Sequence, residues 1–362
     1  MLAGVLVLSA LPGVIGRLPA GHSQVSPATL LTRVQASADV AYSGYAESTG
    51  ALDLPVSAGQ FGSLSDLFGG STQLRVWSRS SLDWRVDQIS ATGETDRFSV
   101  PDGIWSWNYE ADTATLDFQA AGVAVRLPRA DDLLPANLAR RLLSQATPTQ
   151  VSRLADARIA GRDAAGLRYT PAAAQSTIAH VDVWALAATG LVLKVQVFGR
   201  AEAVPVVATS MLDVSISRPA ASVTAFVPPP HARIQQQNAP DIVAFINQLG
   251  RVTPPRQLAG LARADQNSGL GAVGVYGQGV TRLVAIPLFD RTADQLRAQL
   301  SRAVGASTAG TGAISIGVGP LNLLLAAPEG GPGEGSSWLL VGTVSAATLT
   351  TAQAQLPQIG DR

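Results

Sequence analysis

The chain has 362 residues, a formal net charge of zero and no cysteine. This length exceeds what one hydrophobic core usually supports, so we expect two domains. Hydrophobic residues make up 46% and charged residues 14% of the sequence, a globular composition that gives no electrostatic basis for nucleic-acid binding. The absence of cysteine excludes disulfides, thiolate nucleophiles and zinc-thiolate sites.

The N-terminal segment is typical of an exported protein. Residues 2–15 form an almost unbroken apolar run, which has the length of a signal-peptide core. The run is short for a spanning helix, which needs about 20 apolar residues. Leu18-Pro19-Ala20 is a weak cleavage site, so an uncleaved anchor stays an alternative, as does a buried first helix. We expect residues 1–26 to be a signal peptide or membrane anchor with a linker, and the protein to be extracytoplasmic, either secreted or anchored to the cytoplasmic membrane.

A helix, a strand and an irregular excursion are predicted next. Residues 27–40 have the pattern of an amphipathic helix, with Ser26 as its N-cap. Residues 42–54 predict a strand, and residues 55–71 form a Gly/Ser-rich excursion. Its apolar side chains could form a short helix or a lid: Phe61, Leu64, Leu67 and Phe68.

A meander of short strands is predicted from Gln73 to Val125, where the apolar period changes to two. Asp102-Gly103 is its strongest turn signal. The meander holds four of the six tryptophans: Trp77, Trp84, Trp105 and Trp107. Its arginines could form a basic stripe for an anionic headgroup or an acidic partner. Carboxylates are interleaved with them, so a solvated face with cross-strand ion pairs is the stronger prediction: Arg75, Arg79, Arg85 and Arg97 with Asp83, Asp87, Glu94 and Asp96.

A second set of strands follows a second amphipathic helix, predicted at residues 134–145. Thr189-Gly190 gives the tightest hairpin in this set. The strands are predicted at residues 151–159, 166–169, 178–186, 191–198 and 206–216. A sheet, a helix and more of the same sheet indicate an unclosed antiparallel β half-barrel covered by helices.

A break at Pro228-Pro229-Pro230 and Gln235-Gln236-Gln237 separates the half-barrel from the rest of the chain. The fold class is therefore α+β, with a half-barrel at residues 27–228, a linker at 229–237 and a small α+β domain at 238–362. The small domain is predicted to contain helices at residues 240–249, 292–304 and 346–355, a hairpin through Gly277-Gln278-Gly279, and strands near 313–316, 321–325 and 338–341.

Few residues support catalysis. His180 and Asp182 share a strand face and could act as a base and its orienter, as in a hydrolase. The stronger interpretation is a cross-strand polar pair on a solvated face. The sequence contains no Gly-x-Ser-x-Gly elbow and no clustered metal ligands, and its Gly-rich stretches lack the Gly-Lys-Ser/Thr ending of a phosphate loop. We therefore expect neither a cofactor nor enzymatic activity.

The aromatic residues of the two strand sets suggest a binding surface. An unclosed sheet can leave part of its concave face unfilled, so aromatic side chains there could hold an apolar ligand. The alternative is that the rings pack in the protein's own core. The predicted wall of the ligand site consists of Trp84, Trp105, Trp107, Tyr109 and Trp184.

Four short motifs follow one another in a recognisable order: Asp102-Gly103, Trp107-Asn108-Tyr109, Val181-Asp182-Val183-Trp184 and Thr189-Gly190-Leu191. Over residues 27–228 this pattern resembles the LolA and RseB/MucB superfamily of extracytoplasmic lipoprotein-binding folds, and in particular its two-domain actinobacterial members. The resemblance implies an unclosed β-barrel covered by helices, a cavity for lipoprotein acyl chains and no enzymatic activity. In the RseB branch it implies regulation of sigma-factor signalling through an anti-sigma factor.

Three hypotheses about function follow. The first is a non-enzymatic, membrane-anchored or secreted binding protein that holds a lipid or lipoprotein acyl chain, or an apolar peptide, in the half-barrel. The second is an RseB-like regulator that binds a membrane-bound anti-sigma factor. The third and most remote is a hydrolase that uses His180 and Asp182. The N-terminal segment would provide the contact with the membrane, and no nucleic-acid partner is expected.

Overall fold

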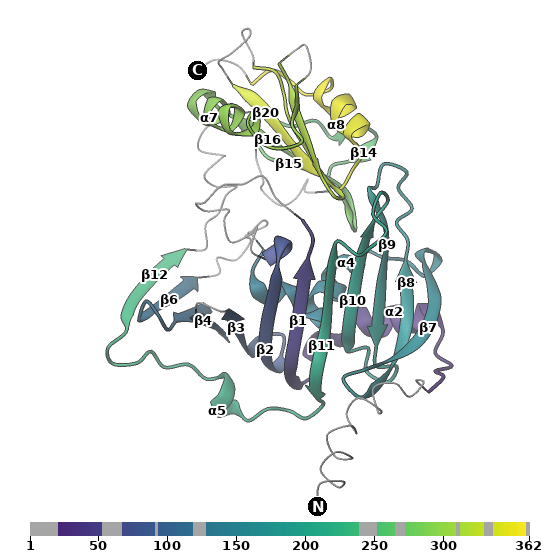
Figure 1. The fold of residues 1–362 in the computed structure, drawn as a ribbon, viewed down its shortest axis with the longest axis vertical. Coiled ribbons are helices and arrows are strands. Elements are labelled where there is room, and N and C mark those ends of the chain that lie inside the picture. Colours follow the sequence, from purple (N-terminus) through teal and green to yellow (C-terminus); the bar gives the residue numbers. More distant parts are fainter. Residues whose placement is uncertain are drawn as a thin grey trace, which may run out of the picture.

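The computed structural model describes residues 21–52, 67–90, 93–118, 128–238, 252–264, 272–308, 312–328 and 336–359. The expected signal peptide or anchor, most of the excursion with Phe61 and Leu64, and the helix expected at 240–249 lie outside the described residues. Within the described part of the chain, a large curved sheet carries a smaller sheet at one end (Figure 1). None of the described helices has the length and apolarity needed to cross a bilayer.

The large sheet contains twelve of the described strands, in the spatial order β12-β6-β5-β4-β3-β2-β1-β11-β10-β9-β8-β7. Neighbouring strands are antiparallel except for β12 and β6, which are parallel. The strands are β1 (Tyr42–Gly50), β2 (Ser71–Ser80), β3 (Asp83–Ser90), β4 (Gly93–Val100), β5 (Gly103–Asn108), β6 (Thr113–Phe118), β7 (Val151–Ile159), β8 (Arg162–Tyr169), β9 (Ile178–Ala185), β10 (Val192–Gly199), β11 (Val207–Ser215) and β12 (Arg233–Asn238). The sheet does not close, because β12 and β7 are both edge strands.

Two helices lie against one face of this sheet, which we call the inner face. Helix α2 (Pro27–Gln35) begins as the sequence predicts, with the Ser26 side chain accepting a hydrogen bond from the Thr29 N–H. It ends earlier than predicted and continues as the 3-10 turn η1 (Ser37–Asp39). Helix α4 (Pro135–Leu143) lies between the 3-10 turns η2 (Ala130–Leu133) and η3 (Pro148–Gln150).

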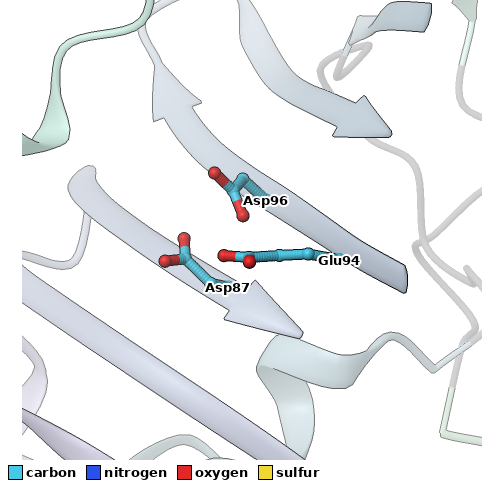
Figure 2. A group of neighbouring side chains, drawn as sticks. All are labelled: Asp87, Glu94 and Asp96. Atoms are coloured by element: carbon cyan, nitrogen blue, oxygen red, sulfur yellow. The ribbon is translucent and has the colours of Figure 1, made fainter. Parts of the chain in front are cut away.

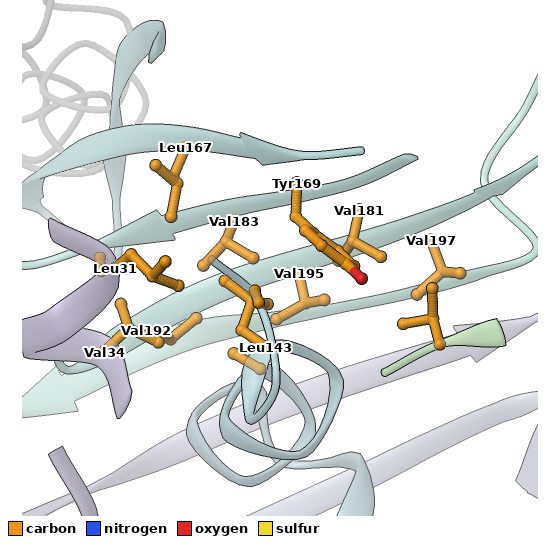
Figure 3. Close-up of a cluster of buried hydrophobic side chains, with 14 of the residues drawn as sticks. Leu31, Val34, Leu143, Leu167, Tyr169, Val181, Val183, Val192, Val195 and Val197 are labelled. Atoms are coloured by element: carbon orange, nitrogen blue, oxygen red, sulfur yellow. The ribbon is translucent and has the colours of Figure 1, made fainter. Parts of the chain in front are cut away.

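The core of the half-barrel lies between these helices and the inner face (Figure 3). Leu31 and Val34 of α2 and Leu143 of α4 pack on strands β8 to β10. The strand residues in this cluster alternate with polar ones, as the period of two requires: Leu167, Tyr169, Val181, Val183, Val195 and Val197. Each fully buried aliphatic side chain contributes about 1.5–3 kcal/mol, so this cluster fixes the helices in the hollow of the sheet.

The smaller sheet has the order β15-β16-β20-β19-β18-β17. Its hairpin at residues 277–279, its strands and its last two helices confirm the elements predicted from the sequence. Its elements are β15 (Gly274–Gln278), β16 (Thr281–Leu288), β17 (Ser307–Thr308), β18 (Ile314–Val318), β19 (Leu321–Leu325), β20 (Ser337–Gly342), α7 (Asp290–Leu300) and α8 (Ala346–Gln353), with the two-stranded pair β13 (Gln257–Leu258) and β14 (Leu261–Ala262) beside them.

The smaller sheet contacts one end of the half-barrel through backbone and side-chain hydrogen bonds. Gln145, just after α4, accepts hydrogen bonds from the Gly279 N–H at 2.7 Å and from Arg282 at 2.9 Å. The Thr177 N–H donates to the Thr343 carbonyl at 3.0 Å. Val280, in the β15 to β16 turn, is buried in the half-barrel core. The two sheets are therefore in direct contact, although each has a hydrophobic cluster of its own.

A long segment crosses the face opposite the helices, which we call the outer face. Residues 216–232, named the strap, run from β11 to β12 and contain the short helix α5 (Ala221–Thr224). Phe226 of the strap stacks on Phe98 with ring centroids 4.6 Å apart. Gln235 to Gln237, which the sequence analysis places in a linker, instead belong to β12 at the edge of the large sheet. Main-chain pairing with β6 compensates for the weak strand propensity of this polar run.

Candidate functional site

The residues predicted to form one apolar wall lie on both faces of the sheet. In the strand register Arg85, Phe98 and Trp105 are direct neighbours, so Trp84 points to the face opposite Trp105. Trp84 lies on the inner face, whereas Trp105 and Trp107 lie on the outer face near the strap. Tyr109 follows β5 and is 48% exposed. The single wall is therefore wrong, because the cross-strand register separates its members.

Trp184 and the described half of the lid also lie apart from that wall. Trp184 is on the outer face of β9, where its Nε1 donates to the Ala155 carbonyl at 3.1 Å and the Lys194 Nζ lies 5.1 Å from its ring centroid. Leu67 is buried in the core of the half-barrel, and Phe68 packs partly buried beside it. These two residues of the predicted lid are part of the hydrophobic core, so they do not form a mobile cover over a cavity.

A cavity of about 420 Å³ lies between the inner face and α4, and we call it the inner cavity. Its floor is mostly apolar: Tyr42, Val76, Trp84, Val86, Ile104 and Leu134. Its rim is polar and rich in arginine: Arg129, Asn137, Arg140 and Arg141. Four serines and the carboxylates of Asp131 and Asp132 also line the cavity, so apolar and polar side chains meet in it.

The arginines of this rim differ in how their charge is balanced. Arg129 pairs with Asp131 at 3.1 Å, and Arg141 pairs with Asp132 at 3.2 Å. Arg140 donates to the Asn137 Oδ1 at 2.7 Å, and no carboxylate of the described residues lies within ion-pair distance of it. Burial lowers the pKa of Arg140, since desolvation disfavours its charged form. Its guanidinium is the rim group best placed to meet an anion.

On the outer face, three carboxylates lie close together (Figure 2). Atoms of Asp87, Glu94 and Asp96 fall within 4.8 Å of one another. Arg85 joins two of them, with its Nε 2.6 Å from the Asp87 Oδ1 and its Nη2 2.7 Å from the Asp96 Oδ2. The predicted cross-strand ion pairs are confirmed, but Asp87 and Asp96 are buried and not solvated. Arg97, predicted on the same stripe, faces the inner side beside Val86.

This carboxylate cluster shifts the titration of its members. Burial, and then the negative charge of Asp87, raise the pKa of Asp96 to about 7. Burial also raises the pKa of Asp87, against the opposing effect of Arg85. One guanidinium cannot neutralise three neighbouring carboxylates, so a proton on the Asp96 carboxyl reduces the negative charge that remains in the cluster.

His180 and Asp182 do not form the base and orienter of a catalytic pair. The His180 Nε2 lies 3.8 Å from the Asp182 Oδ2, whereas Arg168 binds both oxygens of Asp182 at 2.7 Å. The His180 ring stacks on Phe198 with centroids 4.5 Å apart, and burial lowers the pKa of the imidazole. The geometry is that of a cross-strand polar cluster, as the stronger interpretation of the sequence predicts, but Asp182 is buried and not solvated.

Substitutions should separate the structural and catalytic interpretations of this cluster. We expect Arg168→Met to lower the free energy of unfolding by about 2 kcal/mol, because Asp182 would stay buried without its donors. His180→Ala should cost about 1 kcal/mol or less, the loss of one ring contact. Urea unfolding of both variants measures the difference, and a larger effect of His180→Ala would contradict the assignment.

Neither the arginine rim nor the strap has a signature in the sequence that marks it as part of a site. Arg140 and Arg141 are visible as the polar side of the helix predicted at 134–145, but only the packing of α4 on the sheet turns them toward a cavity. Phe226 stands alone in a Pro-rich segment, and no local pattern indicates that its ring stacks on Phe98.

The large unclosed sheet with helices in its hollow is similar to the fold of a solved MucB structure. A structure of MucB in complex with MucA from Pseudomonas aeruginosa is similar at a TM-score of 0.51 and 14% identity, over 92% of this chain and 99% of MucB. No protein-family model and no curated protein matches the sequence. At 14% identity the similarity concerns the fold alone. It is a similarity of tertiary structure, whereas the resemblance seen in the sequence depends on short motifs.

Two further solved structures are more distant. MucB in a crystal structure with MucA(peri) has a TM-score of 0.43 at 14% identity, over 92% of this chain and 99% of that one. A LolA-superfamily protein from Nitrosomonas europaea has a TM-score of 0.23 at 10% identity and covers 56% of this chain and 98% of its own.

Proposed function

We propose that this chain is a non-enzymatic extracytoplasmic binding protein that holds an acyl chain or an apolar peptide in its half-barrel. The observation that carries the proposal is the inner cavity, which combines an apolar floor with an arginine rim in the hollow of an unclosed sheet. Trp84 would contact the apolar part of the ligand, and Arg140 would meet an anionic end group. Division into a half-barrel that extends through β12 and a small domain after it belongs to the same proposal.

Filling the inner cavity tests this function. We expect Val86→Trp to reduce co-purified or exchangeable lipid by at least about tenfold, since each 1.4 kcal/mol of lost binding free energy is a factor of ten. Mass spectrometry of extracted lipid and uptake of a fluorescent fatty acid give the measurement. Val204→Trp is the matched control, because Val204 is an exposed residue outside the cavity lining.

A second variant covers the case in which Val86→Trp does not fold. Arg140→Gln should retain neutral acyl chains and lose anionic ones, because only the rim charge changes. If the unmodified protein carries and takes up no lipid or apolar peptide of any kind, the binding-protein proposal fails.

The second candidate is an RseB-like regulator that binds a membrane-bound anti-sigma factor. It is favoured by the extent of the structural alignment, which covers 92% of this chain and 99% of the MucB chain from a complex with MucA. The test is sedimentation of the purified chain with the extracytoplasmic part of an anti-sigma factor from the same organism. Lipid binding without any such complex would favour the carrier.

A further inference from the structure

A second cavity, of about 390 Å³, lies on the outer face of the large sheet beneath the strap. We call it the outer cavity. Its walls come from β3, β4, the end of β5 and the strap, including Arg85, Asp96, Phe98, Trp107, Tyr109 and Phe226. Strand alternation directs these side chains away from Val86 and Ile104, which line the inner cavity. The sheet therefore separates the two cavities, and the outer one is independent of the function proposed above.

Aromatic rings from distant parts of the sequence meet around this space. Trp107 makes edge contacts with Tyr109 at 5.6 Å and with His231 of the strap at 6.3 Å. Phe226, also in the strap, stacks on Phe98 at 4.6 Å. The faces of such rings attract poorly hydrated organic cations, and a ring of several aromatic side chains is a recurrent way of binding them.

The charge at the floor of the outer cavity has the matching sign. Asp96 lines the cavity, is only 1% exposed, and has one oxygen, Oδ1, without a hydrogen-bond partner. Carboxylate oxygens of Asp87 and Glu94 lie within 4.8 Å of Asp96, and Arg85 is the cation that pairs with Asp87 and Asp96. Asp112 adds a carboxylate at the rim. An excess of negative charge at a desolvated position favours a cationic ligand.

A metal ion fits this arrangement poorly. Arg85 already binds both oxygens of Asp87, at 2.6 and 3.1 Å, and Oδ2 of Asp96 at 2.7 Å. The aspartates would have to release the guanidinium before they could coordinate an ion in common. The aromatic walls would add nothing to a small hydrated ion, which prefers oxygen ligands.

We propose that the outer cavity binds an organic cation, an ammonium or guanidinium group, between the rings of Trp107, Tyr109 and Phe226 with Asp96 as its counter-charge. The strap supplies one wall of this site, so it holds the ligand against the sheet. The cation takes the place of the proton that Asp96 carries in the empty cavity, and binding therefore releases a proton near neutral pH.

Several groups face Asp96 and set this proton linkage. Arg85 and Asp87 approach from β3, Glu94 lies on the same strand as Asp96, and the Tyr109 hydroxyl donates to Asp96 at 3.2 Å. From the strap side, His231 lies near Asp112, with Nε2 and Oδ1 3.5 Å apart. The carboxylates resist ionisation of Asp96, and Arg85 favours it.

Isothermal titration of the full chain with butylguanidinium and butylammonium, and with neutral butyramide as the control ligand, tests the site. At about pH 6 the heat of binding should depend on the ionisation enthalpy of the buffer, which reveals the released proton, and this dependence should disappear at about pH 8. Asp96→Asn should weaken binding of both cations by at least about tenfold, the usual effect of losing a charge-assisted contact. Trp107→Leu should weaken it as well.

The matched control is Trp84→Leu, which changes a tryptophan on the inner face of the same sheet and should leave cation binding unaltered. Butyramide binding as tightly as the cations, or unchanged affinity in Asp96→Asn, would overturn the proposal. Failure of every cation to bind at millimolar concentration would also overturn it. These outcomes do not depend on whether the inner cavity holds lipid.

A third titration distinguishes a basic side chain of a polypeptide from a free small cation as the source of the cationic group. A blocked pentapeptide with a central arginine is titrated beside butylguanidinium. A clearly tighter peptide identifies a basic side chain of a polypeptide as the ligand, whereas equal or weaker binding identifies a free small cation. Both outcomes support the class of ligand, and the tryptophan fluorescence of Trp107 under the strap gives a second readout of occupancy.

Discussion

Gly190→Ala should lower the free energy of unfolding by about 3 kcal/mol, which is a large part of the stability of a typical domain. Gly190 forms the turn between β9 and β10 and has φ of 73°, a left-handed conformation that costs other residues free energy. An added Cβ would also lie 2.6 Å from the Val34 nitrogen and in contact with the Arg33 backbone. Because both atoms belong to the backbone of α2, the helix would have to move off the sheet.

Gly161→Ala is the matched control for this prediction. Gly161 lies in the turn between β7 and β8 with the same φ of 73°, but an added Cβ there has no atom within 4 Å. Its substitution should cost only the backbone term, about 1 kcal/mol. Urea unfolding of both variants isolates the contribution of the contact between the turn and α2. Equal losses in the two variants would show that this close approach is absent.

Asp96→Asn is expected to change how stability depends on pH. In the unfolded chain Asp96 titrates near its ordinary value of 3.8, whereas in the folded protein its pKa is about 7. Between these values the folded state holds a proton that the unfolded state has released, so stability falls as pH rises from about 4 to about 7. The fall amounts to roughly 4 kcal/mol, since the pKa differs by about three units and one pKa unit corresponds to about 1.4 kcal/mol.

The asparagine variant should lose most of this pH dependence, because its side chain does not titrate. A smaller slope from Asp87 should persist, since burial raises the pKa of that group as well. Asp102→Asn, in the exposed turn between β4 and β5, is the control and should follow the unmodified protein. Urea unfolding across the pH range gives the curves. Parallel curves for Asp96→Asn and the unmodified protein would refute the buried protonated carboxyl.

Much of the element order could be predicted because its signals are local. The cap at Ser26, the alternation at Leu74 and Val76 and the turn at Gly190 each depend on a few adjacent residues, and the structure contains all three. The candidate site was less predictable. Trp84 and Trp105 both alternate correctly within their strands, yet the register of β3, β4 and β5 places them on opposite faces. That register depends on pairing between strands, which a single-strand pattern does not contain.

The sequence by itself determined the fold class, the strand-rich halves and the resemblance to LolA/RseB-like proteins, since these follow from hydrophobic period, turn residues and short motifs. Tertiary structure alone decided which face each aromatic residue occupies, that residues 233–238 join the sheet, and that Asp96 is buried. The physical reason is that burial and cross-strand neighbours arise only when distant segments pack. The strap is an example, because Phe226 acquires its place only by stacking on Phe98.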